Sequence, residues 1–205
     1  MYLFLKSFFD RSVSIISIFF LLPFFLFISL LIIIIDKEKP FFRQIRIGYK
    51  KRKFYILKFR TMTKRVQIES KETLGVNDPR ITALGKILRK TKIDELPQLV
   101  NIFLGNMSFV GPRPEIPYYA ENYNSKEQVI FQVKPGLTDY ATLDLINIDN
   151  IFENRDIYSP EEFYKNKIQT FKKKKQLEYI QKISFWVDLK IIFLTIYFIF
   201  KKNNG

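Results

Sequence analysis

Two adjacent carboxylates followed by a cationic turn are the part of this sequence best suited to chemistry. Asp94 and Glu95 open the segment DELPQLVNIFLGNMSFVGPRP, whose closing Gly-Pro-Arg-Pro turn contains Arg113. A carboxylate that attacks a phosphate needs a hard metal ion to reduce the repulsion and cations to absorb the developing charge. The pair therefore indicates phosphate chemistry, in which one residue attacks while the other binds metal or handles a proton.

The same pair also has a purely structural interpretation. Asp94 is a good N-cap residue, and Glu95 and Pro97 would then fall in the first turn of a helix, where Pro is tolerated and negative charge is favoured. The apolar residues of this helix would form its buried stripe: Leu96, Leu99, Val100 and Phe103. Taken alone, an Asp-Glu pair is more typical of capping than of catalysis.

Four cations are candidates for binding the phosphates. Lys58 and Arg60 are two residues apart in a segment typical of a β-strand, so both should project from one face. The segments 39–48 and 53–62, separated by Gly48, predict a hairpin. Arg89 precedes the acidic pair, and Arg113 is held between two prolines. By itself, the strand face would be equally consistent with a solvated surface.

Composition limits the kinds of chemistry available. The chain has 34 Lys and Arg against 20 Asp and Glu, a net charge of +14, with no His and no Cys. The excess of positive charge indicates anionic partners such as nucleic acid, lipid headgroups or phosphorylated metabolites. The absence of His and Cys excludes disulfides, thiolate nucleophiles and imidazole bases, so carboxylates, Lys, Arg, Tyr or a hard metal ion must do the chemistry.

The N-terminal region predicts a membrane helix. No charged residue lies between Ser12 and Ile35, and a helix of that length reaches roughly 36 Å at about 1.5 Å per residue. Pro23 at its midpoint predicts a bend. Basic residues flank both ends, so the positive-inside tendency does not choose between a kinked span and a helix that returns to the leaflet it entered.

The C-terminal half predicts two further helices. The segment 161–183 is Lys-rich, and its run Lys172–Lys175 is most simply a solvated or membrane-facing cationic surface. The apolar stretch 183–200 is interrupted by Asp188 and Lys190, which favours an interfacial or packing helix with Trp186 at headgroup level.

Several motifs together resemble one family. They are Lys58-Phe-Arg-Thr-Met62, Asp78-Pro-Arg-Ile-Thr82, Leu88-Arg-Lys90, Asp94-Glu-Leu-Pro-Gln98, Asn101, Gly105-Asn-Met107, Val110-Gly-Pro-Arg-Pro114, Lys134-Pro-Gly-Leu-Thr138 and Ser184-Phe-Trp-Val-Asp-Leu-Lys190. Each is weak alone, but the combination runs through nearly the whole chain. The sequence resembles the bacterial sugar transferases known as monotopic phosphoglycosyl transferases.

The resemblance implies an activity and its participants. Such enzymes move a sugar 1-phosphate from a UDP-sugar to undecaprenyl phosphate, release UMP and require Mg²⁺. It implies that Asp94 is the nucleophile and forms a covalent phosphosugar ester in a ping-pong reaction, with Glu95 beside it for metal and charge handling. Asp94 and Glu95 are therefore the expected metal ligands, and Lys58, Arg60, Arg89 and Arg113 the expected phosphate-binding residues.

The resemblance also implies an architecture and a location. We expect an α+β fold in which residues 1–38 form a re-entrant membrane helix broken at Pro23. Residues 39–205 should form a small, mostly helical catalytic domain with a short β-hairpin and interfacial amphipathic helices. The domain would lie on the cytoplasmic face of the bacterial inner membrane and would begin the assembly of a surface glycan that downstream glycosyltransferases extend.

One region departs from the family pattern. Many members continue the Pro-Gly-Leu/Ile-Thr element with Gly-Trp-Ala-Gln, whereas this chain has Asp139-Tyr140-Ala-Thr. Asp139 and Tyr140 are therefore candidates for contacting the nucleotide or sugar, although a role in a turn or strand is the simpler interpretation. The sugar, the glycan pathway and the oligomeric state stay open.

An interpretation from another class is a membrane-tethered basic module that binds anionic lipid or nucleic acid without catalysis. It requires only the positive charges and leaves the acidic pair unexplained. We therefore expect an enzyme that does not bind nucleic acid.

Overall fold

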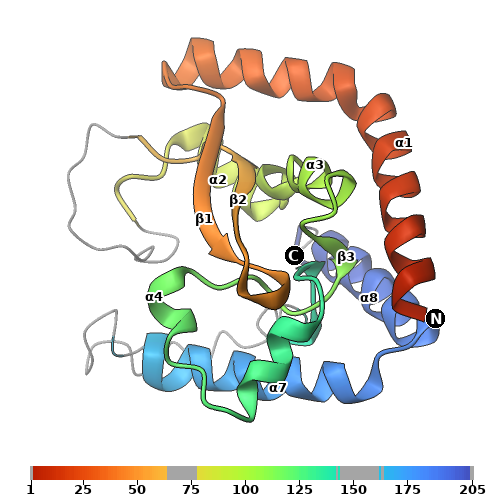
Figure 1. Ribbon diagram of the computed structural model, residues 1–205. Helices are drawn as coiled ribbons and strands as arrows, with labels where there is room; N and C mark the ends of the chain where they lie inside the picture. Colours follow the sequence, from red (N-terminus) through yellow and green to blue (C-terminus); the bar gives the residue numbers. More distant parts are fainter. Residues whose placement is uncertain (1, 64–77, 142, 144–161, 163, 204–205) are drawn as a thin grey trace.

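The computed structural model describes residues 2–63, 78–141, 143, 162 and 164–203 (Figure 1). The α-helices are α1 (Tyr2–Leu31), α2 (Ala83–Lys90), α3 (Gln98–Phe103), α4 (Pro117–Ala120), α7 (Thr170–Lys182) and α8 (Phe185–Asn203). The strands are β1 (Phe41–Ile47), β2 (Lys53–Phe59), β3 (Ser108–Val110) and β4 (Gly136–Thr138). Short 3₁₀ or π segments are η1 (Ile32–Asp36), η2 (Tyr49–Lys51), η3 (Ile93–Glu95), η4 (Glu127–Gln132) and η7 (Tyr164–Gln169).

The predicted hairpin is confirmed. Strands β1 and β2 pair antiparallel, with Phe42 opposite Lys58 and Arg46 opposite Phe54. The Gly48 amide donates to the Arg52 carbonyl at 2.9 Å and closes the turn. Because side chains alternate along a strand, Phe54 and Ile56 are buried beneath β2 while their neighbours remain accessible.

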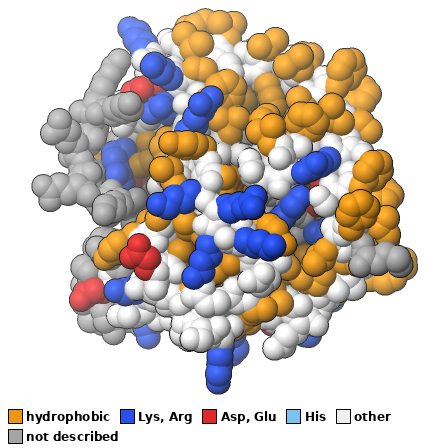
Figure 2. All heavy atoms as spheres, viewed as in Figure 1, with side chains coloured by type: hydrophobic (Ala, Val, Ile, Leu, Met, Phe, Trp, Pro, Cys, Tyr) orange, Lys and Arg blue, Asp and Glu red, His pale blue; other side chains and the backbone are white. Residues whose placement is uncertain are grey.

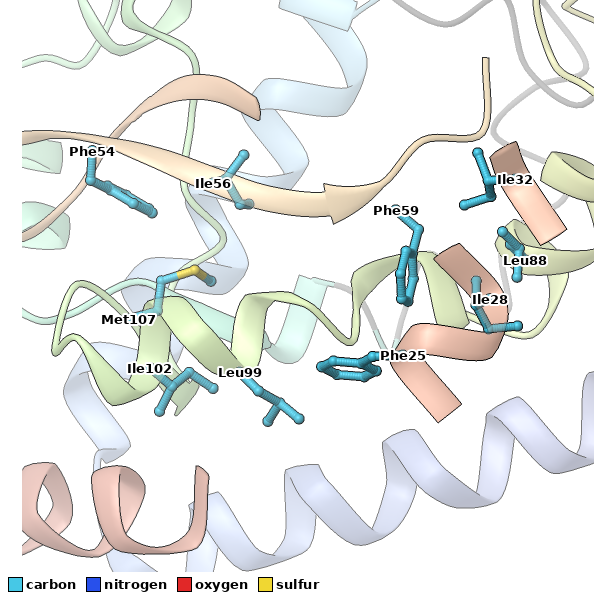
Figure 3. Close-up of a cluster of buried hydrophobic side chains, with 10 residues drawn as sticks. All are labelled: Phe25, Ile28, Ile32, Phe54, Ile56, Phe59, Leu88, Leu99, Ile102 and Met107. Atoms are coloured by element: carbon cyan, nitrogen blue, oxygen red, sulfur yellow. The ribbon is translucent and has the colours of Figure 1, made fainter. Parts of the chain in front are cut away.

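The main hydrophobic core lies between this hairpin and three helices (Figure 3). Phe54 and Ile56 of β2 point toward Met107 and α3, and the ring of Phe59 packs edge-on against Phe25. Leu99 and Ile102 belong to the same cluster but point to the side of α3 away from β2. The C-terminal half of α1 and the π-helical segment η1 that follows it contribute the remaining wall of the core through three buried residues: Phe25, Ile28 and Ile32. The segment expected to be a membrane anchor is therefore also part of this core.

Both ends of α1 contact the same domain. Pro23 lies inside this helix, which bends near its middle and wraps around one side of the molecule (Figure 1). At its N-terminal end, the Ser108 hydroxyl donates to Asp10 at 2.6 Å and the Lys134 ammonium donates to Ser7 at 2.7 Å. Beyond its C-terminal end, the Thr82 hydroxyl donates to Asp36 at 2.8 Å. A straight helix would separate its two ends by its whole length, so the bend is what allows both contacts.

The outer surface of α1 is apolar. The stretch Tyr2–Asp36 is long and apolar enough to cross a membrane, and only 17% of its most apolar 18 residues is buried. Figure 2 shows hydrophobic side chains along the edge where α1 runs, while Lys and Arg gather over the middle of the same face. An apolar surface of this size is typical of contact with lipid.

A second pair of strands was not predicted. Strands β3 and β4 pair in parallel, with Ser108 opposite Gly136 and Val110 opposite Thr138. Each has only three residues, which is too short for the alternating pattern that identifies a strand from sequence. The helix-rich α+β architecture with a short hairpin is confirmed, and this parallel pair is added to it.

The predicted helix beginning at Asp94 is wrong. Asp94 and Glu95 lie in the 3₁₀ turn η3, and α3 begins only at Gln98, with Pro97 at the N-cap position and no side-chain cap. Proline has no N–H to leave unpaired and its φ suits a helix start, so the helix begins beside it and not at the acidic pair. The buried stripe shifts accordingly: Ile102 is fully buried, whereas Phe103 is exposed.

Candidate active site

A polar cleft of 560 Å³ collects the residues that the sequence singled out. Its wall contains Asp94 and Glu95 of η3 together with all four of the predicted phosphate-binding cations, which are Lys58, Arg60, Arg89 and Arg113. These residues come from the hairpin, α2, η3 and the loop after β3, which lie far apart in the sequence. The structure thus brings the six residues to one place, and their roles in catalysis remain predictions.

The cleft is strongly cationic. Among its described lining residues, eight are Lys or Arg and three are acidic, the third acid being Glu115. Four of these cations were not predicted as site residues: Arg46, Arg80, Lys92 and Lys172. A concave surface with this excess of positive charge concentrates anionic ligands.

Glu95 is clamped by two of the predicted cations. The Lys58 ammonium donates to its Oε1 at 2.7 Å, and the Arg113 guanidinium donates to Oε1 at 2.5 Å and to Oε2 at 3.3 Å. Burial alone would raise the pKa of Glu95, but Arg113 and Lys58 outweigh that effect and hold this pKa well below its usual range. Glu95 is therefore an ionised carboxylate that orders the two cations beside it.

Asp94 has the opposite environment. Its side chain is only 7% exposed, and Oδ1 is buried without a hydrogen-bond partner among the described residues. Burial, followed by the negative charge of Glu95, raises the pKa of Asp94 above its ordinary value. A buried carboxylate oxygen without a partner is costly, and this one lies at the wall of the cleft, where a bound cation would offset the cost.

Lys58 is positioned by the Asn101 side chain, which forms hydrogen bonds with the backbone of β2. Asn101 of α3 accepts a hydrogen bond from the Leu57 amide at 2.9 Å and donates to the Tyr55 carbonyl at 2.7 Å. These bonds tie the strand to α3, the helix that follows the acidic turn. Burial lowers the pKa of Lys58, and the charge of Glu95 opposes this shift.

Arg113 is positioned through the backbone of its own turn. The Gly111 amide donates to Thr138 at 3.1 Å, and the Pro112 carbonyl accepts from Gly136 at 3.0 Å. The Arg113 amide donates to Asp139 Oδ2 at 3.2 Å, and its carbonyl accepts from Gln176 of α7 at 3.2 Å. A Cβ on Gly136 would lie 2.1 Å from the Gly111 amide nitrogen, so this approach requires glycine.

The structure places the two candidate donor-binding residues away from the lining of this cleft. Asp139 is 1% exposed and supports the backbone at Arg113. The ring of Tyr140 packs edge-on against Tyr179, with centroids 6.1 Å apart. Asp139 therefore acts on the cleft only indirectly, by supporting the turn that carries Arg113.

The remaining predicted arginines differ in how they are held. Arg89 donates to the Thr61 hydroxyl at 2.8 Å, and burial lowers its pKa. Arg60 donates to the backbone carbonyls of Lys39 and Phe41 at 2.9 and 3.3 Å. Of the two, Arg60 has more of its donor capacity committed to the backbone.

Arg80 was missed as a site residue although its motif was noted. Its guanidinium donates to both oxygens of the buried Asp78, at 2.9 and 2.7 Å. An Asp-Pro-Arg turn that buries the acid and orients the arginine is a signal that the sequence did contain.

The interpretation of Lys172 as part of a solvated run is wrong. Lys172 lines the cleft, and its ammonium donates to the Tyr164 hydroxyl at 2.8 Å, which in turn donates to Glu115 at 2.9 Å. Burial lowers the pKa of Lys172. No local signal distinguishes it from the neighbouring lysines, because only the packing of α7 against the cleft selects it.

The acidic pair fits a metal ion that is shared with a ligand. Among the described residues, no group of three or more His, Cys, Asp or Glu could hold a metal by itself. Mg²⁺ is commonly bound by one or two carboxylates together with substrate phosphates, and the unpartnered oxygen of Asp94 is a suitable hard ligand. The oxygens of Glu95 already face Lys58 and Arg113, so Asp94 is the more available of the two.

Comparison with known proteins identifies the family. The profile described as bacterial sugar transferase matches residues 1–202. The chain is 36% identical over 198 residues to the UDP-glucose:undecaprenyl-phosphate glucose-1-phosphate transferase of Xanthomonas campestris pv. campestris, covering 93% of this chain and 37% of that protein. It is 37% identical over 158 residues to the uncharacterized sugar transferase EpsL of Bacillus subtilis (strain 168), covering 76% of this chain and 67% of that one.

A third relative is similar over most of both chains. The exopolysaccharide production protein ExoY of Rhizobium meliloti (strain 1021) is 32% identical over 206 residues, covering 93% of this chain and 83% of ExoY. The chain spans little more than a third of the Xanthomonas protein but most of ExoY. Because the family profile matches residues 1–202, nearly the whole chain, and the cationic cleft is built from the family's motifs, the chain belongs to the bacterial sugar transferase family.

Proposed function

We propose that this protein transfers a sugar 1-phosphate from a UDP-sugar to undecaprenyl phosphate, releases UMP and so begins the assembly of an exopolysaccharide or related glycan. The names of the relatives support this substrate class. The observation that carries the proposal is the acidic pair itself. Among the described residues, Asp94 Oδ1 has no hydrogen-bond partner, whereas the adjacent Glu95 holds two cations, and both acids lie in a cleft with a large excess of positive charge.

In the first step, a carboxylate oxygen of Asp94 attacks the phosphorus that bears the sugar. The bond from that phosphorus to the oxygen bridging it to the UMP phosphate breaks, which yields UMP and an aspartyl phosphosugar ester. Arg113 can offer two parallel donors to the phosphate oxygens, and Lys58 adds a second charge nearby. Glu95 keeps both cations in place before the substrate arrives, so little reorganisation is needed during the reaction.

In the second step, an oxygen of undecaprenyl phosphate attacks the same phosphorus. The acyl phosphate bond breaks, the Asp94 carboxylate is regenerated and the product is a lipid diphosphate sugar. Asp94 and Glu95 are the residues that would hold Mg²⁺ together with substrate phosphates. When bound, the ion reduces the repulsion between carboxylate and diphosphate.

The shape of α1 supports a re-entrant anchor. Asp10 near its N-terminal end and Asp36 of the following segment η1 both contact the same domain, while the outer surface of the helix is apolar. A helix that enters and leaves through the same leaflet satisfies both features and keeps both basic flanks on one side. We assign the domain to the cytoplasmic face of the inner membrane, where UDP-sugars are available and where the acceptor phosphate lies at headgroup depth.

The experiment is to trap the intermediate. The purified full-length protein is incubated with a panel of UDP-sugars, each carrying radiolabel in the β-phosphate, first without acceptor and then with undecaprenyl phosphate. Wild type should retain label covalently and release UMP, and adding acceptor should transfer the label to lipid. Asp94→Asn should show neither, a loss of at least about 10⁴-fold in turnover.

The control is Glu121→Gln, which removes a carboxylate from the exposed surface and should behave as wild type. Full turnover by Asp94→Asn would reject the nucleophile. Failure of every donor to release UMP from the wild type would favour the non-catalytic basic module.

A further inference from the structure

A second cavity of 310 Å³ lies beside the cleft and is almost entirely apolar. Its lining comes from three separate parts of the chain: the segment after η3, the parallel strand pair and α8. The apolar residues that form it are Leu96, Phe109, Leu137, Ile192, Ile196 and Ile199. This cavity is called the α8 groove below.

The α8 groove and the cleft meet at the acidic turn. Lys92 and Glu95 line both cavities, whereas Asp94 lines only the cleft. Lys92 is exposed, and its backbone adopts a left-handed conformation with a φ of 59°, immediately before η3. Its positive charge opposes the rise that burial causes in the pKa of Asp94, and it adds to the lowering of the pKa of Glu95 by Arg113 and Lys58.

The α8 groove is also continuous with an apolar outer surface. Ile196 lines the groove and is 50% exposed, and the neighbouring Phe193 and Tyr197 are exposed as well. A chain leaving the groove along α8 would therefore pass directly onto a surface suited to lipid.

We propose that the α8 groove holds the phosphate-proximal part of the isoprenoid chain of the lipid acceptor, and that Lys92 binds the acceptor phosphate where the groove meets the cleft. This inference rests on the proposed function and deepens it. An occupant must be apolar along the groove and anionic at one end, and it must present that end to Asp94. A prenyl phosphate has this distribution, whereas the UDP-sugar donor has no apolar portion and fits only the cleft.

The first test is a matched pair of charge substitutions on α8. Ile196→Glu places a carboxylate in the groove, and Phe193→Glu places one on the exposed surface three residues away. Because burying apolar surface supplies the affinity, Ile196→Glu should raise the KM for undecaprenyl phosphate at least about tenfold. Formation of the phosphosugar adduct from donor alone should be unchanged in both variants, and Phe193→Glu should keep the wild-type KM.

Lys92→Gln should raise the KM for undecaprenyl phosphate, and Lys92→Arg, which keeps the charge, should restore the wild-type value. An equal rise in KM for Ile196→Glu and Phe193→Glu would mean that only membrane contact was lost and would overturn the proposal. If the wild type formed no phosphosugar adduct from the donor alone, the proposed function itself would be wrong. This outcome is distinguishable from failure of the acceptor-site proposal.

The second test does not depend on catalysis or on variant folding. Wild-type protein in nanodiscs is photolabelled with an undecaprenyl phosphate analogue that carries a diazirine on its first isoprene units. Label should appear on residues 192–199 and near Leu137, and unlabelled undecaprenyl phosphate should compete. Labelling confined to α1, or equal competition by phosphatidylglycerol, would overturn the assignment of the groove to the isoprenoid chain.

Discussion

The cleft and the α8 groove share Glu95 and Lys92 but have opposite chemistry. The cleft is lined by eight Lys or Arg residues, and the groove is lined mainly by aliphatic and aromatic side chains. The acidic turn lies at the boundary between them, with Glu95 in the lining of both cavities and Asp94 in that of the cleft. In the proposed reaction, this change in polarity would place the water-soluble diphosphate and the bilayer-bound phosphate on either side of the turn.

After the loss of Asp94 itself, substitution of Arg113 should have the largest effect on activity, and it should affect the cleft but not the α8 groove. Arg113→Ala removes a fork-shaped donor from the cleft and leaves Glu95 with only Lys58, so kcat/KM for the UDP-sugar should fall about 10²- to 10³-fold. Release of UMP under single-turnover conditions measures this loss.

Two controls test whether the effect of Arg113→Ala is specific to donor binding in the cleft. Arg52→Ala, in the exposed hairpin turn, removes the same charge far from Glu95 and should have little effect. Photolabelling of the α8 groove should also persist in Arg113→Ala. If turnover survives the loss of Arg113, the cleft does not bind the donor phosphates in the way proposed.

An intermediate effect is expected on stability at Glu95. Glu95→Gln replaces a charged partner of Lys58 and Arg113, which should lower the free energy of unfolding by about 1.5 to 3 kcal/mol near neutral pH. Because the folded-state pKa of Glu95 is depressed, the unfolded chain takes up its proton first as the pH falls. The contribution of Glu95 is therefore present above its unfolded pKa and is lost as the pH falls toward the lower folded value.

Asp94→Asn is the matched control for this measurement. Its folded-state pKa is raised, so ionised Asp94 opposes folding above the unfolded pKa, and removing the charge should increase stability slightly at neutral pH. Thermal unfolding in detergent without divalent metal, from pH 3 to pH 7, compares the two variants. The same direction of change in both would contradict the opposite environments of the adjacent carboxylates.

The smallest effect is expected at Asp139. Asp139→Asn keeps the shape of the side chain but weakens its bond to the Arg113 amide, so kcat should fall about tenfold while the donor KM changes little. Steady-state kinetics with varied UDP-sugar measures the two constants separately. A large rise in the donor KM with an unchanged kcat would restore Asp139 as a residue that contacts the donor.

Much of the fold was predictable because it depends on local patterns. The hairpin followed from strand-forming residues around Gly48, and the helices α7 and α8 from the Lys-rich segment 161–183 and the apolar stretch 183–200. The helix at Asp94 failed because two start signals lay three residues apart and the proline prevailed. Strands β3 and β4 were missed because each is stabilised by a partner distant in sequence, with too few residues to show a pattern.

The sequence by itself determined the chemical inventory: an acidic pair without His or Cys, an excess of cations, an apolar N-terminal segment with Pro23, and motifs of one family. Only the tertiary structure decided that Glu95 is held by two cations while Asp94 keeps an oxygen with no partner in the described part of the chain. It also decided that Lys172 faces the cleft and that both ends of α1 contact one domain. Residue types and short spacings are local properties, so they can be read directly from the sequence. Burial, pairing and charge environment arise from contacts between distant segments, so they exist only once the chain is folded.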